Sequence, residues 1–218
     1  MAEDGSEALI TALVPPGVTC CEQIGTLGGS LLRNEMDLLS SNTVSKRREE
    51  FAAGRTCART ALAKLGIAPI SILQGSQGEP LWPEHTIGSI THCTGYCAAA
   101  VMSQHPYRGL GIDAESNEAL PVDVLRLIGK PEELQWISNM TDEDICWDRL
   151  LFSIKESVYK VWYPQEHCWL DFHQACVEID RETETFRVNL DCPGLFCPQT
   201  IEGRFVVTRS LILSCAWV

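Results

Sequence analysis

Asp113 and Glu115 stand two residues apart in GLGIDAE, residues 109–115. On a β-strand, residues two apart project from the same face, so both carboxylates would reach into one space. Two carboxylates on one face outline a site for a hard cation such as Mg²⁺. The bare pattern is also that of an acidic sheet edge facing water, which is the commoner case.

A second group of charges lies in FSIKESVYK, residues 152–160, where Lys155, Glu156 and Lys160 interrupt an apolar pattern of helical period. Glu156 and Lys160 stand four apart, the spacing of a surface ion pair worth about a few tenths of a kcal/mol. Apolar and aromatic residues flank these charges on both sides. Charges in such surroundings more often have a partner.

A hydroxyl and an imidazole follow one another in SITHC, residues 89–93, as Thr91 and His92. A lone histidine is most often a hydrogen-bonded structural residue. The other histidines lack the HxH or HExxH spacing of a zinc hydrolase. The eleven cysteines lack the paired CxxC spacing of a structural zinc site, and their odd number does not indicate a disulfide framework. We therefore expect reduced, mostly buried thiols.

The chain is acidic, with a formal net charge of −12, but one segment is basic. Its cationic residues are Lys46, Arg47, Arg48, Arg55, Arg59 and Lys64. The pattern predicts a helix over 43–65 with Arg48, Arg55 and Arg59 near one face and Gly54 as a candidate break. A basic cluster in an acidic protein indicates a local anionic ligand, although a solvated helix face has the same pattern. The net charge disfavours nucleic acid as a partner.

The chain has 218 residues, 45% of them hydrophobic, which is enough for one larger domain or two lobes of roughly 100 residues each. No apolar run approaches the roughly 18 residues that cross a bilayer, and the amino-terminal MAEDGSEALI is acidic where a signal peptide is basic. We expect a cytoplasmic protein without membrane contact, with loosely ordered residues 1–19.

Helical and strand-like patterns alternate in a repeated order. The first helix is followed by predicted strands at 87–93, 96–102 and 109–115, with a hairpin turn at Thr94-Gly95. Two helical patterns at about 121–139 and 144–162 come next, and then strands at 175–179, 186–190, 204–208 and 211–218. Helix followed by antiparallel strands thus occurs twice, which predicts an internally duplicated α+β architecture.

Three motifs in this order, GSITHC, GIDAE and FSIKESVYK, resemble the signature of the Sfp-type 4′-phosphopantetheinyl transferases, in the branch that also serves siderophore synthesis and secondary metabolism. The likeness continues through RTCARTALAKLG (55–66), GEPLWP (78–83) and WLDF (169–172). The resemblance implies a monomer of two pseudo-symmetric α/β lobes, residues 1–112 and 113–218. Coenzyme A would bind in the cleft between them.

The resemblance also implies a Mg²⁺ site on Asp113, Glu115 and Glu156, which joins two separate motifs into one site. Three adjacent carboxylates repel each other, and a divalent cation relieves that repulsion. The remaining cation ligands would come from the coenzyme A pyrophosphate and water.

Coenzyme A is strongly anionic and gives the basic segment a ligand. Arg47 and Arg55 correspond to family positions for the 3′-phosphate and adenosine end, whereas the helix-face argument favours Arg48 over Arg47. Thr91 and His92 correspond to residues that contact the phosphates.

Lys155 and Lys160 would face the pyrophosphate from the second long helix. The sequence departs from the family pattern at two positions. Thr91 replaces a serine and keeps the hydroxyl, whereas Glu79 stands where some relatives have a phosphate-contacting lysine. The second departure removes a positive contact.

The implied reaction is phosphoryl transfer: the serine hydroxyl of an apo acyl or peptidyl carrier protein attacks the β-phosphate of coenzyme A, giving the holo carrier and 3′,5′-ADP. Lys155, Lys160 and the metal would neutralise charge on the phosphate oxygens and the leaving group. Glu156 is the first candidate to accept the serine proton, directly or through a metal-bound water, and Glu132 is the second.

Two other functions fit the same residues. A silent module would bind coenzyme A or a carrier without turnover, and a metal-dependent phosphohydrolase would release product from coenzyme A without any carrier. The residue pattern does not distinguish peptide, polyketide, fatty-acid and siderophore assembly, or magnesium from manganese.

Overall fold

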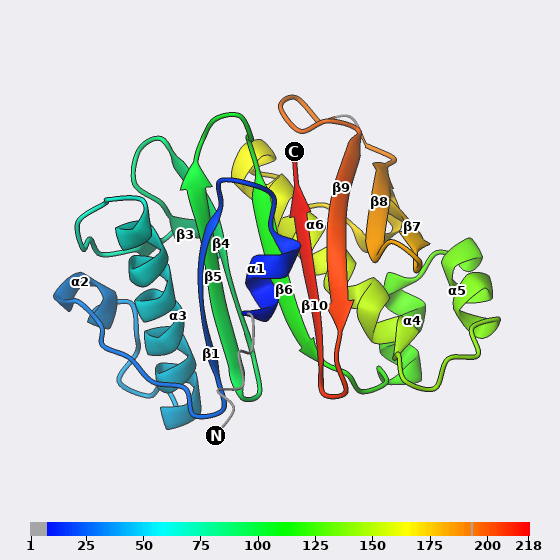
Figure 1. The fold of residues 1–218 in the computed structure, drawn as a ribbon, viewed down its shortest axis with the longest axis horizontal. Coiled ribbons are helices and arrows are strands. Elements are labelled where there is room, and N and C mark those ends of the chain that lie inside the picture. The colour runs from blue at the N-terminus through cyan, green and yellow to red at the C-terminus, as the bar shows by residue number, and fades with distance from the viewer. Residues whose placement is uncertain (1–7, 193) are drawn as a thin grey trace, which may run out of the picture.

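The computed structural model describes residues 8–192 and 194–218. The fold is α+β, as predicted, and its regular elements form two lobes (Figure 1). Each lobe is built on an antiparallel sheet and one helix of 20 residues, α3 (Ser45–Lys64) or α6 (Trp147–Glu166).

The N-terminal lobe contains the strands β1 (Thr19–Ile24), β4 (Thr86–Cys93) and β5 (Tyr96–Ser103), in the order β1-β5-β4. The predicted hairpin turn at Thr94-Gly95 is confirmed, and Gly95 has a φ of 73°, which glycine adopts readily. Smaller elements in this half are α1 (Leu9–Leu13), α2 (Arg33–Met36), β2 (Leu73–Gln74) and β3 (Pro80–Leu81), the last two forming a hairpin.

Helix α3 continues through Gly54, so the predicted break there is wrong. A Cβ atom at this position would lie 3.0 Å from Cγ2 of Ile90 on β4. Gly54 therefore lets the helix pack closely on the sheet rather than interrupting it.

The C-terminal lobe contains the strands β6 (Leu110–Ser116), β7 (Ala175–Asp180), β8 (Thr185–Leu190), β9 (Thr200–Val207) and β10 (Leu211–Trp217). Their order is β6-β10-β9-β8-β7, and every pairing is antiparallel. Two short helices, α4 (Val122–Ile128) and α5 (Pro131–Ser138), replace the single helix predicted over 121–139, because Gly129 is extended and Pro131 starts a new helix.

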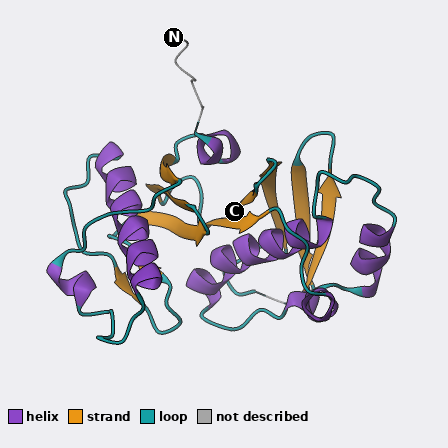
Figure 2. Ribbon diagram, turned by 90° about the horizontal axis from the view of Figure 1, so that it is seen from below, coloured by secondary structure: helices purple, strands orange, loops and turns teal. Residues whose placement is uncertain are grey.

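Alternate residues of the strands show how the lobes are joined. On β10, Ile212 and Ala216 belong to the core under α6, whereas Leu213 and Cys215 belong to a core that includes Ile10 of α1. This second core also contains alternate residues of β5, and the other residues of β5 face α3. Helix α1 thus covers one face of both sheets, while α3 and α6 cover the opposite face (Figure 2).

Strand β6 lies beside β4 at the junction of the lobes, and all of its residues pair with β10. A lobe boundary between residues 112 and 113 would cut this strand. The position of the lobe boundary along the sequence stays a prediction, and β6 pairs with β10 of the C-terminal sheet.

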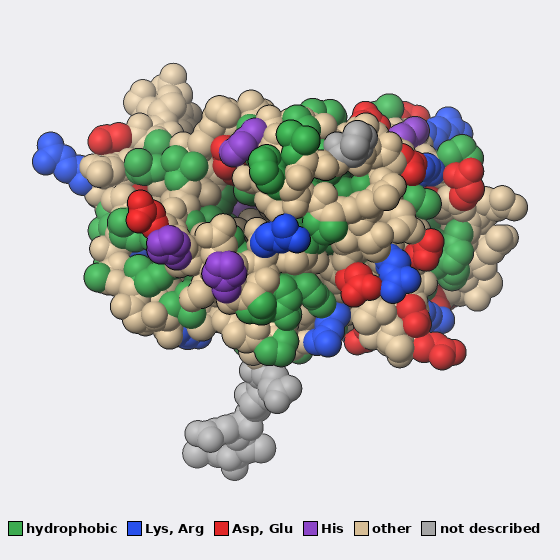
Figure 3. Space-filling model, turned by 90° about the horizontal axis from the view of Figure 1, so that it is seen from above, with side chains coloured by type: hydrophobic (Ala, Val, Ile, Leu, Met, Phe, Trp, Pro, Cys, Tyr) green, Lys and Arg blue, Asp and Glu red, His purple; other side chains and the backbone are tan. Residues whose placement is uncertain are grey.

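All eleven cysteines are free thiols. Burial is the largest cause of the raised pKa of Cys20 and Cys93, and the second-largest cause of the raised pKa of Cys21. In the described part of the chain, no helix is long and apolar enough to span a membrane. On the face shown in Figure 3, Lys and Arg side chains stand singly among neutral and acidic ones.

Candidate active site

Asp113 lies at the junction of the lobes, where β6, β4 and α6 meet. Its side chain is buried, and its Oδ1 accepts hydrogen bonds from Lys160 Nζ at 2.8 Å and Thr91 Oγ1 at 3.4 Å. Lys160 also donates to the Ile112 carbonyl at 2.9 Å. One carboxylate therefore joins side chains of three motifs that are far apart in the sequence.

Gly111 allows β6 and α6 to pack closely at this junction. A Cβ atom at Gly111 would lie 2.0 Å from the Ser157 carbonyl oxygen and 3.1 Å from Cβ of Lys160. A side chain at this position would push α6 away from β6 and separate Lys160 from Asp113.

The two strand carboxylates each keep one oxygen uncommitted. Asp113 Oδ2 is buried and has no hydrogen-bond partner among the described residues. Glu115, two residues along β6, accepts a hydrogen bond on Oε2 from Arg149 Nη1 at 3.0 Å. A buried carboxylate oxygen without a partner is costly, and a bound cation would satisfy it.

Glu156 projects from α6 near these carboxylates, and it has neither a hydrogen bond nor an ion pair to any described residue. Burial raises the pKa of Glu156, and the charge of Asp113 raises it further. Burial and Asp113 likewise raise the pKa of Glu115, while Arg149 opposes that rise. The three predicted ligands are thus electrostatically coupled. No three His, Cys, Asp or Glu side chains among the described residues already converge in a metal-binding arrangement.

Two cavities meet at Glu156 and Tyr159, which line both of them. The larger, of about 780 Å³, lies between the β2–β3 hairpin, β4 and α6, and therefore between the lobes. The smaller, of about 230 Å³, lies between α6 and the segment Trp169–Phe172. A long ligand can extend to either side of Glu156.

Arg47 contacts the site through His92. Its Nη1 lies 2.6 Å from His92 Nε2, and Glu50 Oε2 lies 3.7 Å from the other ring nitrogen. Burial and then the Arg47 charge lower the pKa of His92, so its ring is neutral near pH 7. Arg48 is exposed and its side chain has no polar partner in the described chain, so its contact with a ligand stays a prediction.

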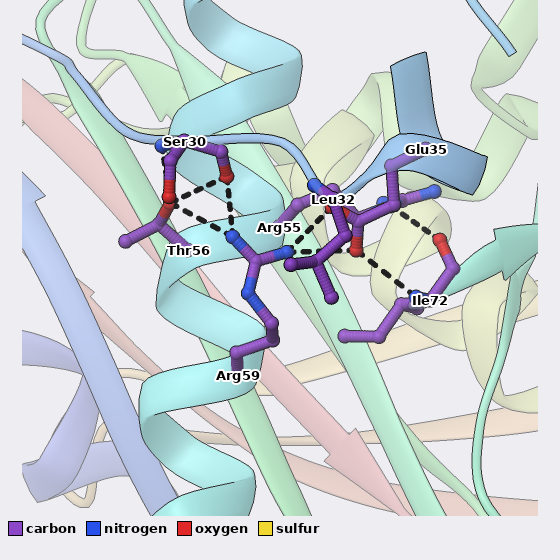
Figure 4. Close-up of polar contacts among 7 residues, drawn as sticks. All are labelled: Ser30, Leu32, Glu35, Arg55, Thr56, Arg59 and Ile72. Atoms are coloured by element: carbon purple, nitrogen blue, oxygen red, sulfur yellow. Dashed lines mark hydrogen bonds and ion pairs between the residues drawn. The ribbon is translucent and has the colours of Figure 1, made fainter. Parts of the chain in front are cut away.

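Arg55 is buried beneath the segment that leads into β2 (Figure 4). Its Nε donates to the Ile72 carbonyl at 2.8 Å, and its guanidinium lies 4.3 Å from the centre of the Phe51 ring. Burial lowers the pKa of Arg55 to about 10, which leaves it charged at pH 7. Its Nη2 is buried without a partner among the described residues, so this nitrogen is available to an anion.

A carboxylate that sequence reasoning missed supports this segment. Glu35 is fully buried, accepts a hydrogen bond from Arg59 Nη1 at 2.6 Å, and accepts the Ile72 amide at 3.0 Å (Figure 4). Arg59 is therefore paired with Glu35, whereas Arg55 contacts the loop at Ile72 that Glu35 also binds.

The prediction that Lys155 faces the pyrophosphate is not matched by its position. Its ammonium group is buried and donates to Glu133 Oε2 at 2.7 Å and to the carbonyls of Ile128 at 2.8 Å and Phe172 at 2.9 Å. All three of its protons have acceptors within the chain. These contacts give Lys155 a structural role.

Glu133, rather than its neighbour Glu132, is the buried carboxylate of the KPEEL segment. It accepts the Val177 and Lys130 amides at 2.9 and 2.8 Å, besides pairing with Lys155. Glu132 is exposed and has no hydrogen bond or ion pair within the described residues. Its candidacy as a general base therefore gains no support from its surroundings.

Glu79 folds back onto its own hairpin. Its Oε2 accepts the Gln77 amide at 2.9 Å, and a Cβ atom at Gly75 would lie 1.9 Å from its Oε1. The residue lines the larger cavity, and its carboxylate closes the β2–β3 turn. The loss of a phosphate contact at Glu79 stays a prediction.

Two family models match the chain in consecutive segments. The family model described as the 4′-phosphopantetheinyl transferase N-terminal domain matches residues 34–102. The model described as the 4′-phosphopantetheinyl transferase superfamily matches residues 109–211. The two matches divide between β5 and β6, which belong to different sheets.

Individual relatives share the same family name. The chain is 44% identical to the 4′-phosphopantetheinyl transferase Svp of Streptomyces mobaraensis over 191 residues, which span 85% of this chain and 78% of Svp. It is 38% identical to the 4′-phosphopantetheinyl transferase Npt of Nocardia iowensis, over 94% of this chain and 98% of Npt. It is 33% identical to enterobactin synthase component D of Escherichia coli (strain K12), over 66% of this chain and 71% of that protein.

The family models and the named relatives define the class of protein as a group-transfer enzyme. The chain belongs to the 4′-phosphopantetheinyl transferase family. Its activity is the transfer of 4′-phosphopantetheine from coenzyme A to a carrier protein.

Proposed function

We propose that this chain performs the transfer with a magnesium ion held by Asp113, Glu115 and Glu156. The observation that carries the proposal is Asp113 Oδ2, a buried carboxylate oxygen without a partner among residues 8–192 and 194–218. Among the described residues, Glu115 Oε1 has no hydrogen-bond partner, and Glu156 has none that would have to be displaced. Carboxylate oxygens are the donors that Mg²⁺ prefers, so the residues fit the ion. When bound, the metal would polarise the phosphoryl oxygens and neutralise charge on the leaving group.

Coenzyme A is proposed to bind between the lobes with its nucleotide end toward α3. Arg55 Nη2, buried and unpartnered, supplies a cation for the 3′-phosphate, with Arg47 as the outer contact. The neutral His92 ring and the Thr91 hydroxyl supply hydrogen bonds to phosphate oxygens. Lys160 has two acceptors in the chain and one proton left for a phosphate.

The chemical step joins the carrier serine oxygen to the β-phosphorus and breaks the bond from that phosphorus to the oxygen that leaves with 3′,5′-ADP. Glu156 is proposed to accept the serine proton. Lys160 offsets the charge that develops on the phosphate oxygens and leaving group.

The partners proposed are coenzyme A and apo acyl or peptidyl carrier proteins, with the chain acting as a monomer in the cytoplasm. Thr91, Asp113 and Lys160 meet within one chain, so this part of the site needs no second copy.

The experiment is to incubate the purified chain with coenzyme A, MgCl₂ and an apo carrier, and to weigh the carrier by mass spectrometry. The carrier should gain the mass of phosphopantetheine, and a chelator should prevent the gain. An unchanged carrier across a panel of apo carriers would favour the silent binding module. Release of 3′,5′-ADP without a carrier would favour the phosphohydrolase.

A further inference from the structure

Arg149, in the first turn of α6, binds the loop that follows β6. Its Nη1 donates to Glu115 Oε2 at 3.0 Å, its Nε donates to the Glu118 carbonyl at 2.9 Å, and its Nη2 lies 3.5 Å from the Ala119 carbonyl. The guanidinium is thus held on three sides by the segment that carries Glu115. Neither the sequence motifs nor the family resemblance singled out this arginine.

Asp113 and Glu115 on β6 are each held by one cationic side chain. Asp113 gives Oδ1 to Lys160, and Glu115 gives Oε2 to Arg149. Each carboxylate is therefore fixed through one oxygen and keeps the other uncommitted. Both cations come from α6, one from its first turn and one from its middle.

We propose that Arg149 is a positioning residue for the metal site: it fixes Glu115 through Oε2 and so presents Oε1 to the cation as a single-oxygen ligand. The inference rests on the proposed function, because it assumes that Glu115 binds the metal. Groups that orient metal ligands commonly change metal affinity by roughly 10- to 100-fold when they are removed.

The shape of the guanidinium matters to this role as much as its charge. Its planar fork reaches two backbone carbonyls and the carboxylate at the same time. A lysine would keep the charge but not this set of contacts. Electrostatics alone predicts the opposite effect of a neutral substitution, because removing a nearby positive charge should favour cation binding.

A variant of Asp148 serves as a control that separates the orientation of Glu115 from general support of the loop after β6. Its Oδ2 accepts the Leu120 amide at 2.7 Å, so it also ties α6 to the loop after β6 but does not contact Glu115. Arg187 supplies a matched surface control, because its Nη2 donates to Glu202 at 2.9 Å in an exposed pair on β8 and β9.

The test measures Mn²⁺ binding by electron paramagnetic resonance, with coenzyme A present and no carrier, for the full chain and four variants. Arg149→Met and Arg149→Lys should each weaken Mn²⁺ binding about tenfold. Arg187→Met should bind Mn²⁺ like the unmodified chain, and Asp148→Ala should lower the unfolding temperature while changing Mn²⁺ binding less than Arg149→Met does.

Three results would overturn the proposal: equal or tighter Mn²⁺ binding by Arg149→Met, unchanged binding by Arg149→Lys, or equal weakening by Asp148→Ala. The carrier mass assay separates this inference from the proposed function. Phosphopantetheine transfer by the unmodified chain together with any of these results would reject the role of Arg149 alone. Absence of both transfer and Mn²⁺ binding by the unmodified chain would reject the metal site itself.

Discussion

Two lysines on α6, Lys155 and Lys160, stand five residues apart and have different surroundings. The Lys155 side chain is 1% exposed and has three acceptors, whereas the Lys160 side chain is 28% exposed and has two. The first pairs with Glu133 inside the C-terminal lobe, and the second pairs with Asp113 at the junction of the lobes. A charge inside a motif can therefore support the fold or the site, depending on the number of partners it already has.

Lys155→Met is the variant with the largest expected effect. It leaves the buried Glu133 carboxylate without its cation, which should lower the free energy of unfolding by about 3–5 kcal/mol. Urea denaturation followed by circular dichroism measures the loss. The double variant Glu133→Gln, Lys155→Met should be more stable than Lys155→Met alone, since it removes the unpaired charge. A fully stable single variant would contradict the structural role.

Lys160→Met should instead reduce catalysis while largely preserving the fold. The phosphate loses a donor, and Asp113 loses the cation that fixes Oδ1, so turnover should fall about 10²-fold or more. Initial rates of carrier modification at saturating coenzyme A measure this, with the urea midpoint as the check on folding. Equal losses of stability in the Lys155 and Lys160 variants would remove the distinction between these two lysines.

Arg47 and Arg48 offer a similar comparison on α3, with a smaller effect. Arg47→Met removes the contact with His92 and a charge for the nucleotide end, so KM for coenzyme A should rise about tenfold with turnover at saturation less affected. Arg48→Met is the matched control, because Arg48 is exposed and unpartnered in the described chain. A larger rise for Arg48→Met would support the helix-face prediction.

Glu156→Gln should change the free energy of unfolding least, and the size of this change should depend on pH. The folded-state pKa of Glu156 is raised above its unfolded value, so ionisation costs the folded state stability as pH rises through the interval between the two values. The variant should therefore gain stability relative to the unmodified chain at pH 7, and the gain should vanish at low pH. Urea midpoints at several pH values, measured without metal, test this. A gain that increases toward acid pH would contradict the raised pKa.

The sequence predicted which elements carry several residues of the candidate site. Alternation along 109–115 placed Asp113 and Glu115 on one face of a strand, and β6 has that arrangement. The FSIKESVYK pattern placed Glu156 on a helix, and α6 contains it. The strand predictions for β4, β5 and β7–β10 lie within a few residues of the observed bounds, because local periodicity follows from which face of each strand is buried.

Local sequence patterns did not predict which residues pair with each charged side chain. Glu133 and Lys155 are 22 residues apart, and the carbonyls of Ile128 and Phe172 complete the same cluster from other segments. Arg47 rather than Arg48 contacts His92 because α3 runs straight past Gly54 and packs on β4 at one particular rotation. No spacing in a single segment encodes such a rotation.

The sequence by itself determined the elements, the acidic and basic residue types, and the order of motifs that identifies the family, because these depend on neighbours along the chain. Only the tertiary structure decided which charges remain available to ligands. Burial and long-range contacts commit Lys155, Glu133, Glu35 and Arg59 to the fold. The same packing leaves Asp113 Oδ2 and Arg55 Nη2 without partners in the described chain, where a cation and an anion can satisfy them.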